Sequence, residues 1–289
     1  MLIVKIYAGL ANQMFQYALY KSLLSSNKTA LTDTNSFLPK WEFEKVSLED
    51  IFPNVKINNA EPYLIEKIAD NKKDILNKLK RKLNFYKSSF YKEPKYSYNP
   101  AVFDLDGDYY LQGFWQTEKY FKKIEDEIRN DFQFPPFENP ENIRISEILK
   151  SEDSVSVHIR KGADYQKKST VGTCNINYYK KAVDYMRMNI KNPKFYIFSD
   201  NHQWVKNNLT DFDYTVIDWN PSSGPQNYLD MQLMATCRHN IIANSSYSWW
   251  GAWLNNNDDK IVIGPDKWFT LDGPDYDSST ILPDNWVKI

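Results

Sequence analysis

The chain has 289 residues, a formal net charge of -1 and 42% hydrophobic residues. This length supports a sizeable buried core, and two domains are expected. The balanced charge excludes nucleic acid as the main partner, because duplex binding needs a strong local excess of Lys and Arg.

The beginning of the chain predicts a strand, a glycine turn and a helix. The β-branched run LIVKIY is followed by Met14, Phe15, Ala18, Leu19 and Leu23, which have helical spacing. This apolar run is too short to span a bilayer and lacks the flanks of a signal peptide, so we interpret it as mature structure. Residues 62–98 look helical and then irregular, and residues 108–132 read as a strand, a turn and a helix.

The second half alternates strands and helices more regularly. The prolines of QFPPFENPEN interrupt the pattern, and we place the domain boundary between residues 145 and 146. Beyond it, the strands SVSVHI, KFYIFSD, YTVID, HNIIAN and KIVIG are separated by helical segments, which is typical of βαβ units and a parallel sheet. Cys174 and Cys237 lack metal-site spacing, which argues against a zinc site or a disulfide framework and favours a reducing cytosol.

In SVSVHIR, side chains alternate between the two faces of the predicted strand, so Ser156, His158 and Arg160 share one face. Open α/β sheets bind ligands at the carboxyl ends of their strands. Arg160, Lys161 and the backbone of Gly162 therefore predict a compact anion site without a metal, because a guanidinium offers a diphosphate two parallel donors. The alternative is a strand end with solvated charges and a hydrogen-bonded histidine.

The strand HNIIAN leads into Ser245 and Ser246 and then into a helix with Trp249 and Trp253. The N–H groups at the start of this helix, together with serine hydroxyls, can cradle phosphate, and simple capping is the alternative. We expect the two tryptophans to be core packing rather than a sugar-stacking platform. The segment FSD ends a third strand at Asp200, so several polar loops converge on one edge of the sheet.

Four segments in order give the chain a resemblance to a family. They are AGLANQMFQYA, HIRKGADY, FSDN and NSSYSWWGAWL. In that order they resemble the opening G-G-L-G-N-Q-M-F-Q-Y-A, the H-x-R-R-x-D, the F-S-D and the closing serine-tryptophan motifs of the bacterial α1,2-fucosyltransferases. That family consists of inverting enzymes that transfer L-fucose from GDP-fucose without needing a metal. The resemblance implies a GT-B-like α/β fold, in which two Rossmann-like domains face each other across a central cleft.

The resemblance also implies residue roles, with domain 1–145 on the acceptor side and domain 146–289 binding GDP-fucose. Arg160 matches the arginine that grips the GDP phosphates and stabilises the leaving diphosphate, which is electrostatic catalysis in place of a metal. Asp230 corresponds to an acidic residue that pairs with guanine in related enzymes. The implied donor-binding residues are Asn12, His158, Arg160, Lys161, Asp230, Ser246, Tyr247 and Ser248.

The chain departs from the family pattern in three places. Ala8 and Ala11 replace glycines, which limits how closely their loop approaches a ligand. Lys161 replaces the second arginine and loses its planar fork. Ala163 is an extra residue that displaces the motif aspartate, Asp164, by one position. Asp164 is our candidate general base, because inversion needs a proton removed from the acceptor hydroxyl, and orienting its loop is the alternative role.

Two other segments have rival interpretations. The aspartates between Asp104 and Asp108 suggest a metal or calcium loop, but we favour a hairpin turn at the Asp-Gly pair. The lysine-rich run of residues 72–95 is expected to be a solvated helix face. Its alternative is contact with an anionic membrane surface, which would suit lipid-linked acceptors.

These features predict a cytoplasmic galactoside α1,2-fucosyltransferase that modifies a surface polysaccharide such as O-antigen, at O-2 of a terminal galactose. Its expected partners are GDP-L-fucose and an oligosaccharide acceptor, with no metal or other cofactor; lipid-linked acceptors and peripheral contact with the inner membrane surface are compatible with this. A fucosyltransferase of another linkage or acceptor is the near alternative. A non-catalytic carbohydrate-binding protein is the distant one, and the α/β pattern counts against it because lectin-like modules are usually all-β.

Overall fold

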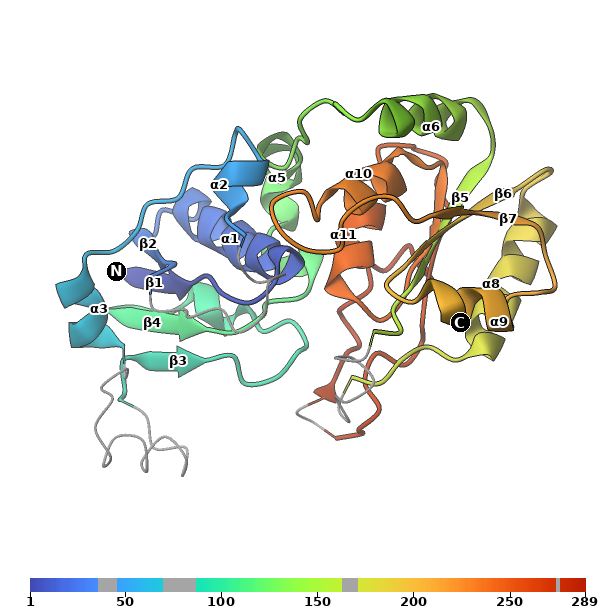
Figure 1. Ribbon diagram of the computed structural model, residues 1–289. Helices are drawn as coiled ribbons and strands as arrows, with labels where there is room; N and C mark the ends of the chain where they lie inside the picture. The colour runs from blue at the N-terminus through green and yellow to red at the C-terminus, as the bar shows by residue number, and fades with distance from the viewer. Residues whose placement is uncertain (36–45, 70–86, 163–170, 274–275) are drawn as a thin grey trace. The chain divides into compact units, whose positions relative to one another are not determined.

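The computed structural model describes residues 1–35, 46–69, 87–162, 171–273 and 276–289. The chain divides into two compact units, Met1–Gln133 and Phe134–Ile289. Each unit contains a parallel sheet flanked by helices (Figure 1), so the predicted α/β class is confirmed. The facing arrangement and the central cleft stay predictions.

The first unit is built on a four-stranded parallel sheet of order β2-β1-β4-β3. Its strands are β1 (Leu2–Lys5), β2 (Ala30–Asp33), β3 (Phe90–Lys92) and β4 (Tyr109–Gln112). Its α-helices are α1 (Leu10–Ser25), α2 (Leu48–Ile51), α3 (Pro62–Ile68) and α5 (Glu125–Asp131), with short 3-10 turns at Pro100–Phe103, Glu118–Tyr120 and Lys122–Ile124. The neighbours of β1 are β2 on one side and β4 on the other, so the topological switch point lies between β1 and β4.

The Asp104–Asp108 segment does not form the predicted hairpin. It follows the 3-10 turn at Pro100–Phe103, and β4 pairs in parallel with both β1 and β3. The Asp-Gly pair does make a turn, with Gly107 at a φ of 114°. The amino group of Met1 donates to the carbonyl oxygen of Gly107 at 2.8 Å, so this turn anchors the start of the chain.

The second unit is built on a six-stranded parallel sheet of order β10-β9-β8-β5-β6-β7. Its strands are β5 (Ser154–Ile159), β6 (Lys194–Ser199), β7 (Tyr214–Ile217), β8 (His239–Ile241), β9 (Val262–Gly264) and β10 (Val287–Lys288). Its helices are α6 (Pro140–Ser151), α8 (Ile176–Asn189), α9 (His202–Asn208), α10 (Leu229–Thr236) and α11 (Ser246–Trp253). The predicted strands and helices of this half are confirmed, and the switch point lies between β5 and β8.

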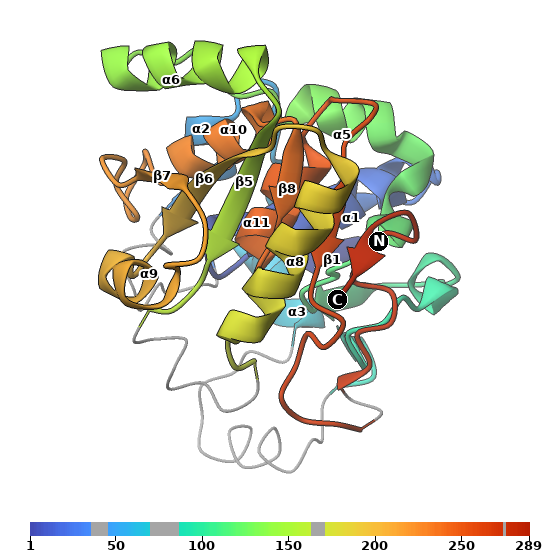
Figure 2. The same cartoon turned by 90° about the vertical axis from the view of Figure 1, so that its right-hand side faces the viewer.

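The two faces of β5 separate the core from the polar layer, as predicted. Val155, Val157 and Ile159 are fully buried against residues of α8 and α9, while α10 and α11 cover the opposite face (Figure 2). On that face the hydroxyl of Ser156 accepts a hydrogen bond from Asn240 Nδ2 at 2.7 Å. The pleat therefore turns His158 toward α11.

The boundary between residues 145 and 146 lies inside helix α6, which belongs entirely to the second unit. The observed boundary, between Gln133 and Phe134, lies at the start of the proline-rich segment. Pro140 starts α6, because it occupies the first helical turn, where no backbone donor is needed. The side chain of Asn139 accepts from Glu141 N at 2.8 Å and caps the helix.

The structure also bears on the cysteines, on membrane-spanning helices and on the lysine-rich run. Cys174 and Cys237 are buried free thiols. In the parts of the chain that the structure describes, no helix is both long enough and apolar enough to cross a bilayer. Residues 70–86 of the lysine-rich run lie outside the described residues. Lys87, in the described part of that run, donates to the carbonyl oxygen of Ala69, just after α3, at 3.4 Å.

Ala8 has a φ of 69°, the left-handed conformation that costs a residue with a Cβ atom about 1–2 kcal/mol. Glycine removes this cost but loses about 0.5–1 kcal/mol through extra conformational freedom in the unfolded chain. We therefore expect Ala8→Gly to raise the free energy of unfolding by up to about 1 kcal/mol in urea denaturation. Ala18→Gly, in the buried interior of α1, is the control and lowers it. Equal destabilisation by both substitutions would contradict the assignment of strain to Ala8.

Candidate functional site

The carboxyl ends of β5, β6 and β8 gather three loops at one edge of the second sheet. The strand β5 pairs in parallel with β6 on one side and with β8 on the other. The loop that begins at Arg160 therefore lies between the loop that begins at Asp200 and the segment that leads into α11. This edge is the switch point at which open α/β sheets bind ligands.

The carboxylate of Asp200 fixes the loop after β5. It forms an ion pair with the Arg160 guanidinium. Its Oδ1 accepts from Lys161 N at 2.7 Å and its Oδ2 accepts from Gly162 N at 2.9 Å. The Arg160 side chain remains 24% exposed, so a guanidinium held in one orientation is still accessible at this edge.

His158 is a neutral ring beside this charge. Burial, helped by the nearby Arg160 charge, lowers the pKa of His158 to about 3. Its ring lies 5.8 Å from that of Tyr247, and its Nδ1 has no hydrogen-bond partner among the described residues. Buried polar atoms are normally paired, so this nitrogen is an unsatisfied polar group beside the Arg160 loop.

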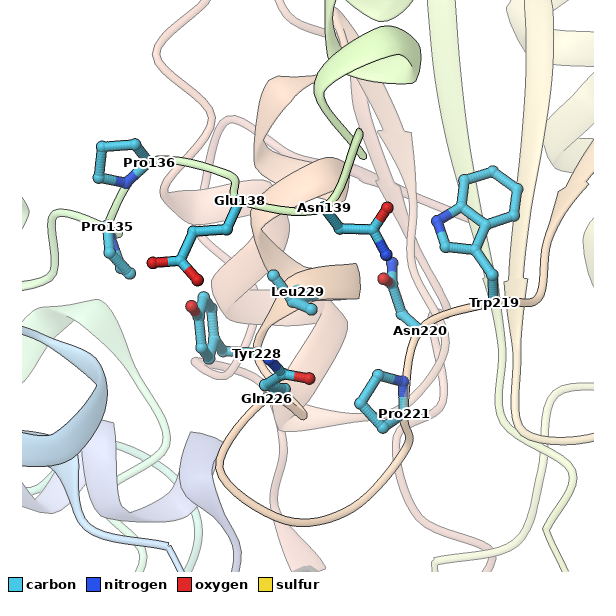
Figure 3. Close-up of a pocket in the computed structure, with 10 residues that line it drawn as sticks. All are labelled: Pro135, Pro136, Glu138, Asn139, Trp219, Asn220, Pro221, Gln226, Tyr228 and Leu229. Carbon is cyan, nitrogen blue, oxygen red and sulfur yellow. The ribbon is translucent and has the colours of Figure 1, made fainter. Parts of the chain in front are cut away.

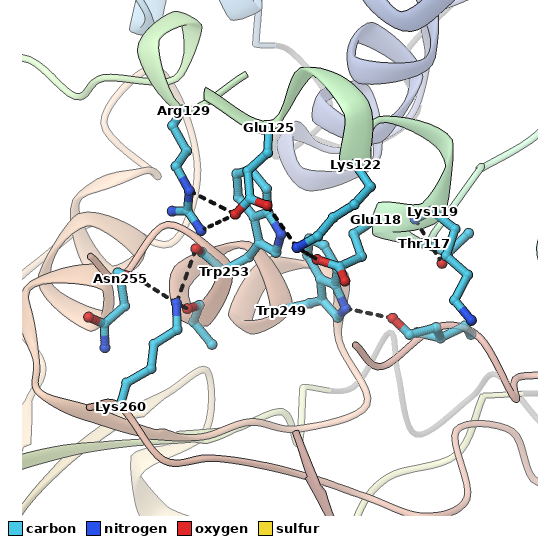
Figure 4. Close-up of polar contacts among 12 residues, drawn as sticks. Thr117, Glu118, Lys119, Lys122, Glu125, Arg129, Trp249, Trp253, Asn255 and Lys260 are labelled. Atoms are coloured by element: carbon cyan, nitrogen blue, oxygen red, sulfur yellow. Dashed lines mark hydrogen bonds and ion pairs between the residues drawn. The ribbon is translucent and has the colours of Figure 1, made fainter. Parts of the chain in front are cut away.

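Helix α11 begins at the same edge. Its N-cap is Ser245, and the Ser245 side chain makes no capping hydrogen bond, so capping does not account for Ser245. At the other end, Lys260 Nζ donates to the carbonyl oxygens of Ala252 at 3.0 Å and Asn255 at 2.6 Å (Figure 4). Because α11 begins in the segment that follows β8, its N-terminus lies at this edge. The partial positive charge of that N-terminus favours an anion there.

The tryptophans of α11 are core residues, as predicted. Trp249 and Trp250 are fully buried and Trp253 is 2% exposed. The Trp249 and Trp253 rings stack 6.2 Å apart, and Trp249 Nε1 donates to the Ile281 carbonyl oxygen at 2.8 Å (Figure 4). This packing fixes the axis of α11 and with it the direction of its N-terminus.

Tyr247 connects α11 to α10. Its hydroxyl accepts from Met231 N at 3.0 Å and donates to the Asn227 carbonyl oxygen. The first turn of α10 contains Asp230, whose Oδ1 accepts from Asn220 Nδ2 at 2.8 Å. The structure therefore brings His158, Tyr247 and Asp230 into one connected group in the second unit.

A pocket of about 200 Å³ is lined in part by Asn220, the hydrogen-bond partner of Asp230 (Figure 3). It is lined by Pro135, Pro136, Glu138, Asn139, Trp219, Asn220, Pro221, Gln226, Tyr228 and Leu229. Behind it, Asn142 donates to Asn220 Oδ1 at 2.8 Å and accepts from Trp219 Nε1 at 2.8 Å. These bonds hold the loop after β7 against α6 and orient Asn220 toward the Asp230 carboxylate.

Other predicted residues occupy different positions. Lys161 is 7% exposed, its Nζ donates to Thr173 Oγ1 at 2.8 Å and it lies 4.6 Å from the centre of the Trp204 ring. Ser248 is fully buried, and its hydroxyl donates to the Ser245 carbonyl oxygen at 3.4 Å. Burial lowers the pKa of Lys161, which indicates a cation that is partly engaged inside the protein.

Asn12 belongs to the first unit, where its Oδ1 accepts from Gln116 Nε2 at 2.8 Å. Ser246 stands at the first turn of α11, half-buried at the sheet edge. Asp164, the candidate base, lies outside the described residues together with the inserted Ala163.

Sequence reasoning missed some residues that build this site. Asp200 ends the segment FSD, which the sequence placed at the edge, but its bonds to the neighbouring loop depend on the register of β5 with β6. Asn142 and Asn220 are far apart in the sequence and give no local signal. Asn244 is a structural anchor, since its Nδ2 donates to the carbonyl oxygens of Val171 at 2.8 Å and Trp268 at 3.1 Å.

Comparison with known proteins identifies the family of the chain. Residues 1–289 match the family model described as Glycosyl transferase family 11. The alpha-1,2-colitosyltransferase of Escherichia coli is 29% identical over 302 residues, which cover 99% of this chain and 98% of that protein. The O-antigen biosynthesis glycosyltransferase WbnK of Escherichia coli is 37% identical over 147 residues, or 49% and 46% of the two chains. Galactoside alpha-(1,2)-fucosyltransferase 1 of Ateles belzebuth is 26% identical over 197 residues, or 62% and 52%.

Burial raises the pKa of Asp230 to about 7, and the hydrogen bond from Asn220 opposes this shift in part. A carboxyl group with a raised pKa stabilises the fold fully below its unfolded pKa, and this contribution is lost as the pH rises through about 7. The Asp230→Asn side chain cannot ionise. We therefore expect the Tm of this variant, relative to that of the wild type, to increase as the pH is raised from about 5 to about 8. One kcal/mol corresponds to about 2–4 °C in a chain of this size. The control is the exposed Asp218→Asn, and a Tm difference for Asp230→Asn that stays constant with pH would contradict the burial cost.

Proposed function

Because the chain belongs to glycosyl transferase family 11, we propose that it is an inverting transferase that moves L-fucose from GDP-L-fucose to a glycan hydroxyl. One observation carries this proposal. Arg160, held by Asp200, and the N-terminus of α11 lie on loops of adjacent strands at the switch point of the second sheet. A guanidinium and a helix N-terminus together suit the two phosphates of a nucleoside diphosphate.

The same groups would assist bond cleavage. As the bond between the sugar carbon and the diphosphate oxygen breaks, negative charge develops on the departing GDP. Arg160 and the N–H groups of α11 are fixed before the reaction, so they stabilise this charge without reorganising. The acceptor hydroxyl attacks the opposite face of the sugar carbon, which inverts its configuration. Its proton passes to a base, for which Asp164 is our candidate.

Recognition of the guanine of the donor is the proposed role of Asp230. An ionised carboxylate accepts two parallel N–H bonds from the edge of a guanine. The Oδ1 of Asp230 is already oriented by Asn220, which also lines the neighbouring pocket. The neutral His158 adds no charge of its own, and its unpaired Nδ1 would bind the nucleotide by a hydrogen bond.

The acceptor and the linkage are proposed from the relatives. The similarity to a galactoside alpha-(1,2)-fucosyltransferase supports O-2 of a terminal galactose. The similarity to an O-antigen biosynthesis glycosyltransferase supports a surface polysaccharide of a bacterium. We place this reaction in the cytoplasm, without a metal ion, on an acceptor that is free or lipid-linked at the inner membrane surface.

Colitosyl transfer is the second candidate. One relative that matches nearly the whole chain is an alpha-1,2-colitosyltransferase. Colitose is fucose without the hydroxyl at carbon 3, so the two donors share the diphosphate and the 6-deoxy sugar. A site with a polar partner for that hydroxyl would favour fucose, and a site without one would accept colitose.

Nucleotide binding tests the role of Arg160. We expect calorimetric titration with GDP in EDTA to show binding by the wild type and a loss of about 2 kcal/mol, roughly thirtyfold in Kd, for Arg160→Ala. The control is Arg238→Ala, which removes a half-exposed arginine next to the amino end of β8. A folded wild type that does not bind GDP would reject the donor site and favour a carbohydrate-binding protein.

Transfer assays test the donor. We expect mass spectrometry to detect one added deoxyhexose on galactose-terminated oligosaccharides with GDP-L-fucose, at the same rate with and without EDTA. GDP-L-colitose should be the poorer donor by a ratio of kcat/KM that reaches about 10⁴ if the 3-hydroxyl is hydrogen-bonded. The reverse preference would select the second candidate. Activity lost in EDTA and restored by manganese or magnesium would reject metal independence.

A further inference from the structure

The first sheet has a switch point of its own, between the carboxyl ends of β1 and β4. The segment Ile6–Gly9 follows β1, and the segment Gly113–Gln116 follows β4. These strands are hydrogen-bonded neighbours, so the two loops leave the sheet side by side. The rule that locates ligands in the second unit therefore applies to this edge as well.

Gln16 ties the two loops together. Its side chain is fully buried in α1, its Oε1 accepts from Tyr7 N at 2.8 Å, and its Nε2 donates to the Gly113 carbonyl oxygen at 3.1 Å. A single amide thus satisfies one backbone group in each loop. Since the amide that makes both bonds is itself buried, it holds the two loops at a fixed spacing.

Glu93 fixes the second loop from the other side. It follows β3, and its carboxylate accepts from Phe114 N at 2.6 Å and from Trp115 N at 3.1 Å. Trp115 has a φ of 57°, and a Cβ atom on Gly113 would collide with the Glu93 side chain. The backbone on both sides of Phe114 is therefore tightly specified, although the Phe114 ring itself is only partly buried.

Three aromatic rings lie together at this edge, and each is partly exposed. The centre of the Phe114 ring is 5.4 Å from that of Tyr7 and 6.2 Å from that of Tyr96. The Phe114 and Tyr96 rings are nearly parallel, with an angle of 10° between their planes. Lys5 Nζ lies 5.2 Å from the centre of the Tyr7 ring and occupies part of that surface. Phe114 therefore offers the main ring surface for a ligand.

We propose that the Tyr7, Tyr96 and Phe114 rings form a stacking site for a pyranose ring of the acceptor glycan. Aromatic faces carry negative potential and attract the C–H groups on the apolar side of a sugar. The N–H groups of Phe114 and Trp115 are already bonded to Glu93, so they do not serve as donors for a phosphate or another anion. This site rests on the proposed function, because it gives the acceptor of that transfer a binding surface in the first unit.

Binding of simple sugars tests the site in the full chain loaded with GDP. The probes are the methyl glycosides of galactose, N-acetylgalactosamine, glucose, N-acetylglucosamine and mannose, followed by saturation-transfer NMR and titration. We expect at least one of them to bind and Phe114→Ala to weaken it about tenfold, the scale of a truncated aromatic contact. The GDP affinity of the variant should remain within about twofold of wild type, since that ligand is assigned to the other sheet.

Phe103→Ala is the matched control, because Phe103 is a partly exposed aromatic of the same unit that precedes β4 and packs on Tyr120. If Phe114→Ala does not fold, Tyr96→Leu removes a stacking ring while retaining apolar volume. Failure of all five glycosides to bind, or binding that survives both substitutions, would overturn the site. A sugar that binds through Phe114 in a chain that does not bind GDP would instead reject the proposed donor and leave this site standing.

Discussion

The candidate anion site depends on the interactions of one carboxylate, that of Asp200, with the loop after β5. A guanidinium on a flexible side chain helps a reaction little if it must be oriented at the moment of charge development. Asp200 pairs with Arg160 and also binds the next two backbone N–H groups, so side chain and loop are fixed by one carboxylate. This is possible because β5 and β6 run in parallel with Ser199 opposite Ile159, which places the loop of one strand beside the last residue of the other.

The regular part of the second unit could be predicted from the sequence because its signals are local. The alternation of Val155, Val157 and Ile159 predicts a strand with one buried face, and the strand SVSVHI has the predicted bounds. Signals that depend on distant partners could not be recognised. The Asp-Gly pair near Asp108 looks like a hairpin until β1 and β3 occupy both edges of β4. The proline-rich segment does mark the boundary, which lies between Gln133 and Phe134, but its exact position could not be predicted because Pro140 begins a helix that continues past residue 145.

Asp230 illustrates a candidate site residue whose ionised form is unfavourable for stability. Burial raises its pKa to about 7, so its ionised form is disfavoured in the folded chain. The bonds from Trp219 through Asn142 and Asn220 to its carboxylate orient the group without supplying a positive charge. An asparagine in this place would avoid the ionisation cost but would lose the second acceptor oxygen. The arrangement is understandable if a ligand supplies the missing donors.

The switch-point loops of the two units are fixed by the same kind of interaction, but they present different chemical groups. In each, a carboxylate that follows the adjacent strand accepts hydrogen bonds from two consecutive backbone N–H groups of the switch-point loop. Glu93 holds Phe114 and Trp115 in this way, and Asp200 holds Lys161 and Gly162. At Asp200 the loop also carries a guanidinium, so the fixed backbone presents positive charge. At Glu93 the carboxylate is surrounded by Tyr7, Tyr91 and Tyr120, and burial raises its pKa to about 7, so that loop presents an aromatic ring. Under the proposed function, the clamp at Asp200 would position a surface for the charged donor, and the clamp at Glu93 would position a surface for an uncharged sugar ring of the acceptor.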